Sequence, residues 1–162
     1  MMLKEKIYST LKQLVAVPSV SGTDGERHAA EKIYETIMDM PYFKEKDGKC
    51  LLEAIKDDPA GRCIVWAMVE GEEKSFDTVL LTAHLDVVDI EGYGHLQPVA
   101  FDMEECTKRI GELELDDEAR RDLESGEWVF GRGTADIKSG IASYIEIVRY
   151  RDSQGIERKQ KF

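Results

Sequence analysis

The sequence lacks any apolar run long enough to cross a membrane, and its amino terminus lacks the apolar region of a secretory signal peptide. It has only three cysteines (Cys50, Cys63 and Cys106), an odd number without a Cys-x-x-Cys pair. This usage excludes a disulfide framework and a thiolate zinc knuckle, and free thiols are typical of a reducing compartment. We therefore expect a cytoplasmic protein with no membrane partner.

Positive charge is scarce as well, because 22 Lys and Arg residues are outnumbered by 33 Asp and Glu residues, a formal net charge of −11. Nucleic acids and anionic membranes bind basic patches, so we expect no nucleic-acid partner. The acidic excess has two interpretations: a soluble surface, or carboxylates reserved for metal cations. Phosphate-binding glycine motifs are also missing, since Asp136 stands where the third glycine of a dinucleotide fingerprint would fall and no P-loop ending occurs.

The 162 residues suffice for about one domain with a core, and 42% of them are hydrophobic. Apolar residues at helical spacing predict a helix over residues 3–16 and another from Ile137 to Val148. A third helix begins at a capping box formed by Thr23 and Glu26 and stops near Pro41.

Residues 1–150 are expected to form this domain, with 90–127 as an insertion-like segment. That segment is too long for an ordinary loop and has short helical patterns at 104–109 and 116–123, so we expect it to be structured or functional. The tail 151–162 is polar and basic and has no apolar periodicity.

Two continuous apolar runs, "RCIVWAMVEG" and "DTVLLTAHLD", are rich in strand-forming residues. Such runs are typical of strands covered on both faces, which predicts an α/β fold with a mixed, mostly parallel sheet. The large rings of Trp66 and Trp128 are expected in the core or at its edge.

The second run ends with His84 and Asp86, two residues apart and therefore on one face of a strand. A neutral imidazole is a good ligand for zinc, and a neighbouring carboxylate can orient the ring. His-x-Asp alone is a weak signal, however, and by itself it is more typical of a satisfied polar pair at a strand end. Further on, Gly131 and Gly133 permit a tight turn that delivers Asp136 to the start of a helix. Asp136 is either a helix cap or a metal ligand.

Together, "AHLDVV" (Ala83–Val88) and "GRGTADIKSG" (Gly131–Gly140) resemble the "(G/A)HxDVV" and "GRGxxDxKxG" patterns of the M20 metallopeptidase family, in the same order. The opening "LVAVPSVSGTDGERHAAEKI" is similar to the family's first helix, Pro-Ser turn and second helix. The stretches "PYFKE", "DDPAGR" and "SGEWVFGRG" resemble its arginine-utilisation branch. The resemblance covers nearly all of residues 3–148.

The resemblance implies the amino-terminal part of a catalytic domain with a three-layer fold, helices lying on both faces of the sheet. It implies a hydrolase with two divalent ions, zinc or alternatively cobalt or manganese, that cleaves amide bonds of small peptides or acylated amino acids. Carried over to this sequence, His84 would ligate one ion, Asp86 would be the catalytic-site carboxylate that orients His84, and Asp136 would bridge both ions.

The chain departs from the family pattern after Asp136, where the adjacent glutamates, the further acidic ligand and the distal histidine have no counterpart. His95 could reach the metal region but is more typical of an ordinary loop histidine. We expect a truncated, inactive fragment that binds at most one ion weakly and forms homo-oligomers through exposed sheet edges. The alternative is a non-catalytic remnant or interaction module that keeps only the fold. The polar tail 151–162 favours this alternative, because an early stop or a shifted reading frame would produce such a tail.

Overall fold

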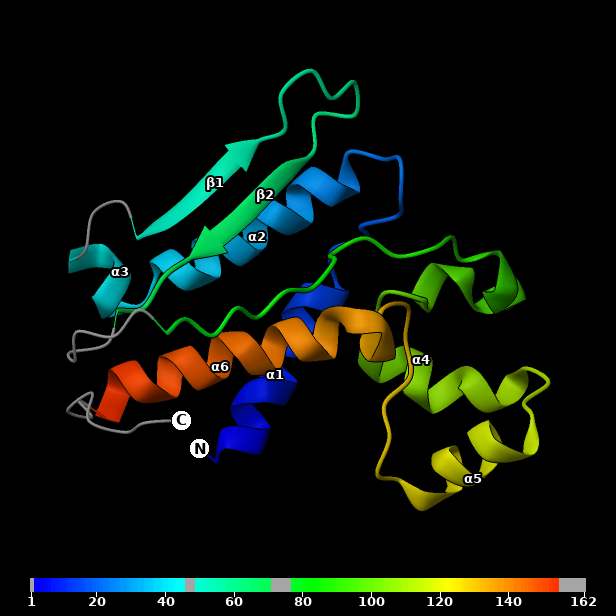
Figure 1. The fold of residues 1–162 in the computed structure, drawn as a ribbon. Helices are drawn as coiled ribbons and strands as arrows, with labels where there is room; N and C mark the ends of the chain where they lie inside the picture. Colours follow the sequence, from blue (N-terminus) through cyan, green and yellow to red (C-terminus); the bar gives the residue numbers. More distant parts are fainter. Residues whose placement is uncertain (1, 46–48, 71–76, 155–162) are drawn as a thin grey trace.

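Three long helices and one small sheet form the larger part of the structure (Figure 1). The structure is a computed structural model that describes residues 2–45, 49–70 and 77–154. The long helices are α1 (Leu3–Val15), α2 (Gly25–Met38) and α6 (Ser139–Gln154). They confirm the three predicted helices, although α6 continues past the end of its apolar pattern. Within the described ranges, no helix combines the length and apolar character that a membrane span requires.

The main core lies where α1 packs against α6, with α2 and the short helix α3 (Pro41–Glu45) beside them. Its buried side chains include Leu11, Leu14, Val15, Ile33, Phe43, Ile141, Ala142 and Ile145. Burial of each larger apolar side chain stabilises the fold by about 1.5–3 kcal/mol, so this interface carries much of the stability.

A buried polar contact crosses the same helix interface. Thr10 Oγ1 donates a hydrogen bond of 2.5 Å to Glu146 Oε1, which also accepts one of 2.9 Å from Arg149 Nη1. Glu146 is fully buried, and these donors offset part of the desolvation of its carboxylate, whose Oε2 has no hydrogen-bond partner among the described residues. Glu146 therefore has a structural setting within α1 and α6, away from any pocket described below.

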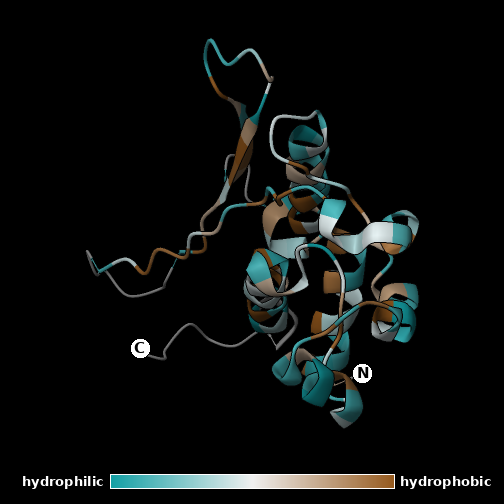
Figure 2. Ribbon diagram, turned by 90° about the vertical axis from the view of Figure 1, so that its right-hand side faces the viewer, coloured by the Kyte–Doolittle hydropathy of each residue, from teal (hydrophilic) through white to brown (hydrophobic). Residues whose placement is uncertain are grey.

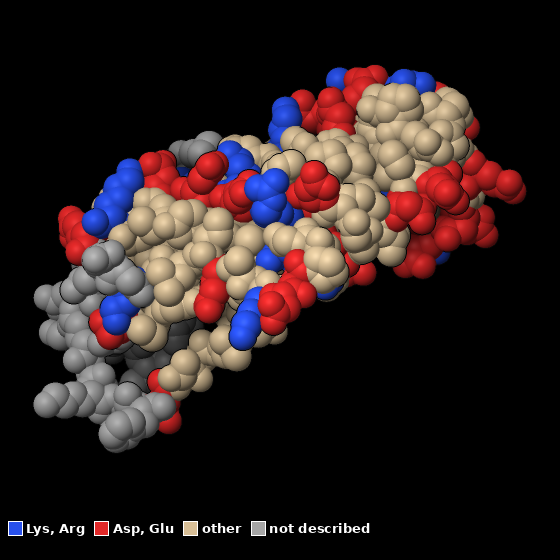
Figure 3. Space-filling model, turned by 90° about the horizontal axis from the view of Figure 1, so that it is seen from above, with Lys and Arg blue, Asp and Glu red and all other residues tan. Residues whose placement is uncertain are grey.

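The insertion-like segment is structured, as expected, around a small core of its own. It contains η1 (Glu91–Val99), α4 (Met103–Arg109), η2 (Ile110–Glu112) and α5 (Asp117–Ser125). Leu96 and Cys106 are fully buried at its centre. Asp102 and Asp116 cap α4 and α5, because each side chain accepts two backbone N–H groups. Seen from above, acidic side chains gather at the end of the molecule where Figure 1 places this segment (Figure 3).

The sheet has two antiparallel strands, β1 (Cys50–Ala54) and β2 (Cys63–Ala67), paired so that Leu52 lies opposite Val65. Helix α2 covers one face of this hairpin (Figures 1 and 2). The other face is open: Ile64 is 55% exposed and Trp66 is 38% exposed. Trp128 is 56% exposed, and neither tryptophan packs against a core cluster of the described residues, so the expectation that both lie in the core or at its edge is wrong.

The described residues therefore show one hairpin with helices on one side, in place of the predicted three-layer sheet with helices on both faces. The segment from Asp77 to Asp86 is extended but pairs with no described strand (Figure 2). Its Leu80 is 80% exposed. An apolar run of this kind is buried only when strands flank it and helices cover it. The described residues supply neither, so the run lies on the surface.

Candidate functional site

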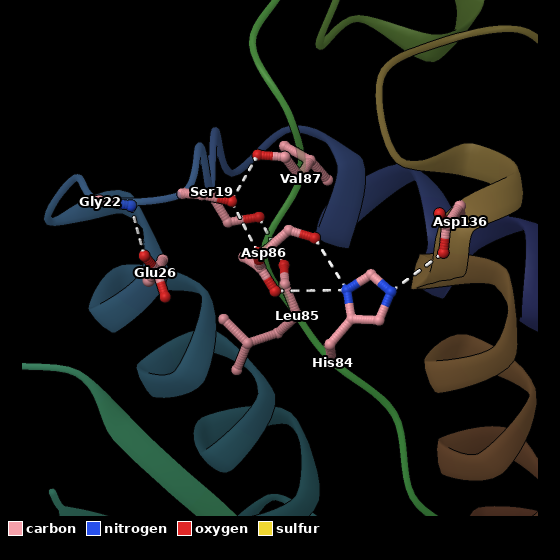
Figure 4. Close-up of polar contacts among 9 residues, drawn as sticks. Ser19, Gly22, Glu26, His84, Leu85, Asp86, Val87 and Asp136 are labelled. Atoms are coloured by element: carbon pink, nitrogen blue, oxygen red, sulfur yellow. Dashed lines mark hydrogen bonds and ion pairs between the residues drawn. The ribbon is translucent and has the colours of Figure 1, made fainter.

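The backbone around Asp86 is held by the turn that follows α1. Val87 N donates to Ser19 O and Ser21 N donates to Val87 O, both at 2.9 Å, which makes a parallel bridge between Val20 and Val87. Ser19 Oγ donates to the Leu85 carbonyl at 2.6 Å (Figure 4). Ser19 is fully buried, so this turn anchors the segment that carries the candidate residues.

The imidazole of His84 lies between Asp86 and Asp136 (Figure 4). Its Nδ1 is 3.1 Å from the Asp86 carbonyl oxygen and 3.3 Å from Asp86 Oδ1, and its Nε2 is 3.0 Å from Asp136 Oδ1. Ser21 Oγ in turn donates to Asp86 Oδ2 at 2.6 Å. The fold thus brings together all three residues predicted for the site, which are 52%, 40% and 87% exposed at their side chains. They lie at the surface and not at the end of a covered strand.

These contacts shift the pKa values of His84 and Asp86. Partial burial lowers the pKa of His84, but the hydrogen bond to Asp136 and the contacts with Asp86 outweigh it and raise the pKa above its ordinary value. The hydrogen bond from Ser21 holds the pKa of Asp86 below its ordinary value, and His84 adds to this effect. Asp86 is thus a carboxylate fixed from one side by Ser21 and directed to the ring of His84 on the other.

The turn that presents Asp136 is built from Gly131–Lys138 and includes the irregular turn η3 (Thr134–Lys138). Gly133 has a φ of 84°, and a Cβ there would lie 2.7 Å from Val87 Cγ1, so only glycine lets this turn approach the His84 segment. The hydrogen bond made by the Asp136 side chain goes to His84. The Asp136 side chain thus faces His84 and caps no helix among the described residues, and metal ligation by Asp136 stays a prediction.

Lys138 ends the turn with a buried ammonium group. Its Nζ donates to Leu14 O at 3.0 Å and to Val17 O at 2.8 Å, and the residue is only 2% exposed. Burial lowers the pKa of Lys138 to about 8. Sequence reasoning assigned no role to Lys138, Ser19 or Ser21. Two signals were present: Lys138 occupies the fixed lysine position of the pattern that "GRGTADIKSG" resembles, and the Ser-x-Ser spacing of Ser19 and Ser21 matches the His-x-Asp spacing, as paired extended segments would.

A pocket of about 220 Å³ opens beside these groups and is lined by His84, Asp86 and the turn from Gly131 to Asp136. An imidazole nitrogen and a carboxylate oxygen 3.0 Å apart can approach one cation together, so the donor set fits a divalent ion in part. Among the described residues, no group of three or more potential ligands is assembled. The described residues thus bring together one imidazole and one carboxylate as candidate ligands.

His95 lies away from this pocket. Its Nε2 is 2.7 Å from Glu112 Oε2, and Arg109 Nε donates to Glu112 Oε1 at 2.8 Å. Arg109, followed by His95, lowers the pKa of Glu112 to about 2. His95 therefore belongs to a surface ion-pair cluster of the insertion-like segment, in agreement with the loop interpretation.

Comparison with known proteins identifies two relatives in Bacillus subtilis (strain 168). The chain is 40% identical over 141 residues to Protein RocB, an alignment that covers 87% of this chain and 25% of that protein. It is 36% identical over 147 residues to the Uncharacterized protein YqjN, covering 90% of this chain and 26% of that protein. The chain is homologous to both over most of its own length, and it spans about a quarter of theirs.

No protein-family model matches the chain, and no solved structure matches it either. Homology to the two Bacillus subtilis proteins is therefore the relationship that the comparisons establish.

Proposed function

We propose that this chain carries the amino-terminal part of a metal-dependent hydrolase domain of the M20 type. The observation that carries the proposal is the imidazole of His84 held between Asp86 and Asp136, at the two motifs that resemble the family. The substrates would be small peptides or acylated amino acids. A role in arginine utilisation is proposed from the resemblance of the surrounding stretches and from the homology with Protein RocB.

Each residue has a role that follows from its contacts. His84 would ligate a divalent ion through Nε2, the nitrogen that faces Asp136, while Asp86 holds Nδ1 on the opposite side of the ring. Asp136 has two oxygens and would hold one ion or bridge two. Two divalent ions, zinc or alternatively cobalt or manganese, would supply Lewis-acid polarisation of the scissile carbonyl.

We propose that the metal site of this chain is incomplete. The described residues offer only His84 and Asp136 as adjoining ligands, and the chain spans about a quarter of its relatives. We therefore expect weak binding of a single ion and no turnover by this chain alone. The three-layer sheet is proposed for a longer polypeptide, in which further strands and helices would cover Leu80 and its neighbours.

The second candidate is a non-catalytic interaction module. The observation that favours it is the open face of the hairpin together with the unpaired segment before His84, because apolar surface of this kind marks an interaction site. On this alternative, the His84 pair would be a remnant that no longer binds metal.

Calorimetric titration with Zn²⁺ separates the two candidates. The hydrolase proposal expects one weak site that His84→Ala and Asp136→Asn each weaken at least ten-fold, with His95→Ala as the matched histidine control that leaves binding unchanged. No zinc binding, or equal loss in the control, would support the remnant. An amidase assay on N-acyl amino acids is expected to show no turnover by the chain alone, and turnover would show that the site is complete.

A further inference from the structure

We propose that Lys138 is a positioning residue that ties the turn carrying Asp136 to the end of α1 and so holds Asp136 against His84. The inference deepens the proposed function and rests on it in one respect, namely that the turn serves to present Asp136 as a metal ligand. The contacts themselves exist without any metal, which allows the two ideas to be tested separately.

The two acceptors of the Lys138 ammonium lie at the carboxyl end of α1. Leu14 O belongs to the last turn of the helix, whose carbonyl groups lack the usual acceptor role toward a residue four positions on, and it also accepts from Val17 N at 3.2 Å. Val17 O lies just beyond the helix. Carbonyls at a helix carboxyl end carry the negative end of the helix dipole. They therefore offer a cation partial negative charge in a place where it meets no water.

No carboxylate pairs with Lys138 among the described residues, which sets it apart from lysines in surface ion pairs. Lys12, for example, pairs with Glu104 at 2.7 Å with both side chains about half exposed. A buried ammonium is costly unless its donors are satisfied, so the position of Lys138 is tightly determined by its two carbonyl acceptors. A lysine needed only to fill space would be replaced there at lower cost by an apolar side chain.

Lys138 connects the two segments that carry the carboxylates of the candidate site. Its backbone N donates to Gly133 O at 3.0 Å, which closes the turn that presents Asp136. Its ammonium group binds Val17 O, and from Val17 the chain enters the turn whose Ser21 binds Asp86. One ammonium group thus fixes the relative placement of the two carboxylates on either side of the His84 ring.

Gly133 makes this connection sterically feasible. A Cβ at that position would lie 3.2 Å from Lys138 Cδ and 2.7 Å from Val87 Cγ1, so the lysine stem and the His84 segment both pack against the glycine. The stem therefore runs directly beneath the turn, and loss of its anchor would free the turn to move away from His84.

The test uses the metal-free chain labelled with ¹⁵N. Lys138→Met removes the ammonium but keeps the length of the side chain, and Lys138→Arg keeps a cation. Thr10→Val is the matched control, because it removes a buried hydrogen bond in the same α1–α6 interface without touching the turn. Asp136→Asn gives the reference spectrum for a weakened contact with His84. The ring ¹⁵N resonances of His84 are recorded at a single fixed pH, and urea unfolding gives the stability of each variant.

The proposal expects Lys138→Met to move the His84 resonances by more than half of the displacement seen in Asp136→Asn. Thr10→Val should leave them unchanged even at similar loss of stability, and Lys138→Arg should return them toward the parent position. If Lys138→Met does not fold, Lys138→Gln, which keeps an N–H donor without charge, is expected to show the same displacement. The positioning role of Lys138 would be overturned if the His84 resonances stayed unmoved in a folded Lys138→Met or Lys138→Gln variant, or if they moved equally in Thr10→Val.

Zinc affinity gives a second and separate readout. Lys138→Met is expected to weaken the single zinc site at least five-fold, while Thr10→Val stays within two-fold of the parent chain. If the parent chain binds no zinc, the proposed function fails, and the ring resonances still decide the role of Lys138.

Discussion

At the scale of single residues, the site is a histidine ring with an acceptor at each nitrogen. The Asp86 carbonyl faces Nδ1 and the Asp136 carboxylate faces Nε2. Because only the imidazolium can donate from both nitrogens, these acceptors stabilise the protonated ring. In the metal-free chain His84 thus contributes stability that is fully present below its unfolded pKa and is lost as the pH rises through its raised folded pKa.

Replacement of Asp136 by Asn is expected to lower the pKa of His84, because the ring loses a charged acceptor while its partial burial remains. The measurement is an NMR titration of the imidazole resonances. Asp89→Asn is the control, since that side chain accepts a bond from Glu91 N and does not contact the ring. An unchanged His84 pKa in Asp136→Asn would contradict the geometry.

A second residue-scale prediction concerns the cluster around His95. Arg109→Gln should raise the pKa of Glu112 from about 2 toward its ordinary value, and more than His95→Gln does, because Arg109 makes the largest contribution. The Glu112 contribution to stability is present above its unfolded pKa and is lost as the pH falls through its folded value. Carboxyl ¹³C shifts measure the titration, and a larger effect of His95→Gln would refute this ranking.

At the scale of elements, the turn between α1 and α2 determines where the site forms. The predicted capping box of Thr23 and Glu26 does not form: Asp24 is the N-cap of α2 and makes no side-chain cap bond. Instead, Glu26 Oε1 accepts from Gly22 N at 2.6 Å and Thr23 Oγ1 accepts from Gly25 N at 3.2 Å, both within the turn. The turn so formed has a tertiary consequence, because it presents Ser21 to Asp86. The local sequence predicted the helix start, and the pairing with a segment about 65 residues away could not be read from it.

Gly25→Ala is expected to destabilise the chain strongly. An added Cβ would lie 1.8 Å from Pro18 O, a backbone atom that cannot move without shifting the turn. Overpacking of this kind costs roughly 3 kcal/mol, the upper end of the usual range. Urea unfolding measures the loss of stability.

Gly92→Ala is the matched control for this substitution, because a Cβ at Gly92 meets nothing within 4 Å. We expect the control to change the free energy of unfolding by no more than about 0.5 kcal/mol. Equal effects of the two substitutions would mean that the close approach to Pro18 is not what requires glycine.

At the scale of the whole molecule, the structure is open on one side. Helices cover only one face of the hairpin (Figure 2). In the extended segment that follows, Val79 is 73% exposed and Leu80 is 80% exposed. An unpaired extended segment with apolar side chains is a template for association.

Leu80→Lys is therefore expected to reduce self-association of the chain. Burial of one leucine stabilises an interface by about 1.5–3 kcal/mol, so the dissociation constant should rise at least ten-fold. Sedimentation velocity over a concentration series measures it, with Leu3→Lys as a control at an exposed leucine of α1. A parent chain that stays monomeric throughout, or equal effects of both variants, would contradict the prediction.

The sequence by itself determined the three long helices and singled out the candidate site residues. Apolar spacing predicted α1, α2 and α6, and the two motifs singled out His84, Asp86 and Asp136. These features are local, since a helix closes its hydrogen bonds within a few residues and a motif specifies its own turn.

Only the tertiary structure decided how those residues meet and what remains uncovered. The contact between His84 and Asp136 spans 52 positions, and that of Lys138 with Leu14 spans 124. The predicted wide sheet was the largest departure, because an apolar run becomes a buried strand only through neighbours on both sides. The run ending at His84 has the composition of such a strand, and the described residues leave it on the surface because strand burial is a property of the partners that surround it.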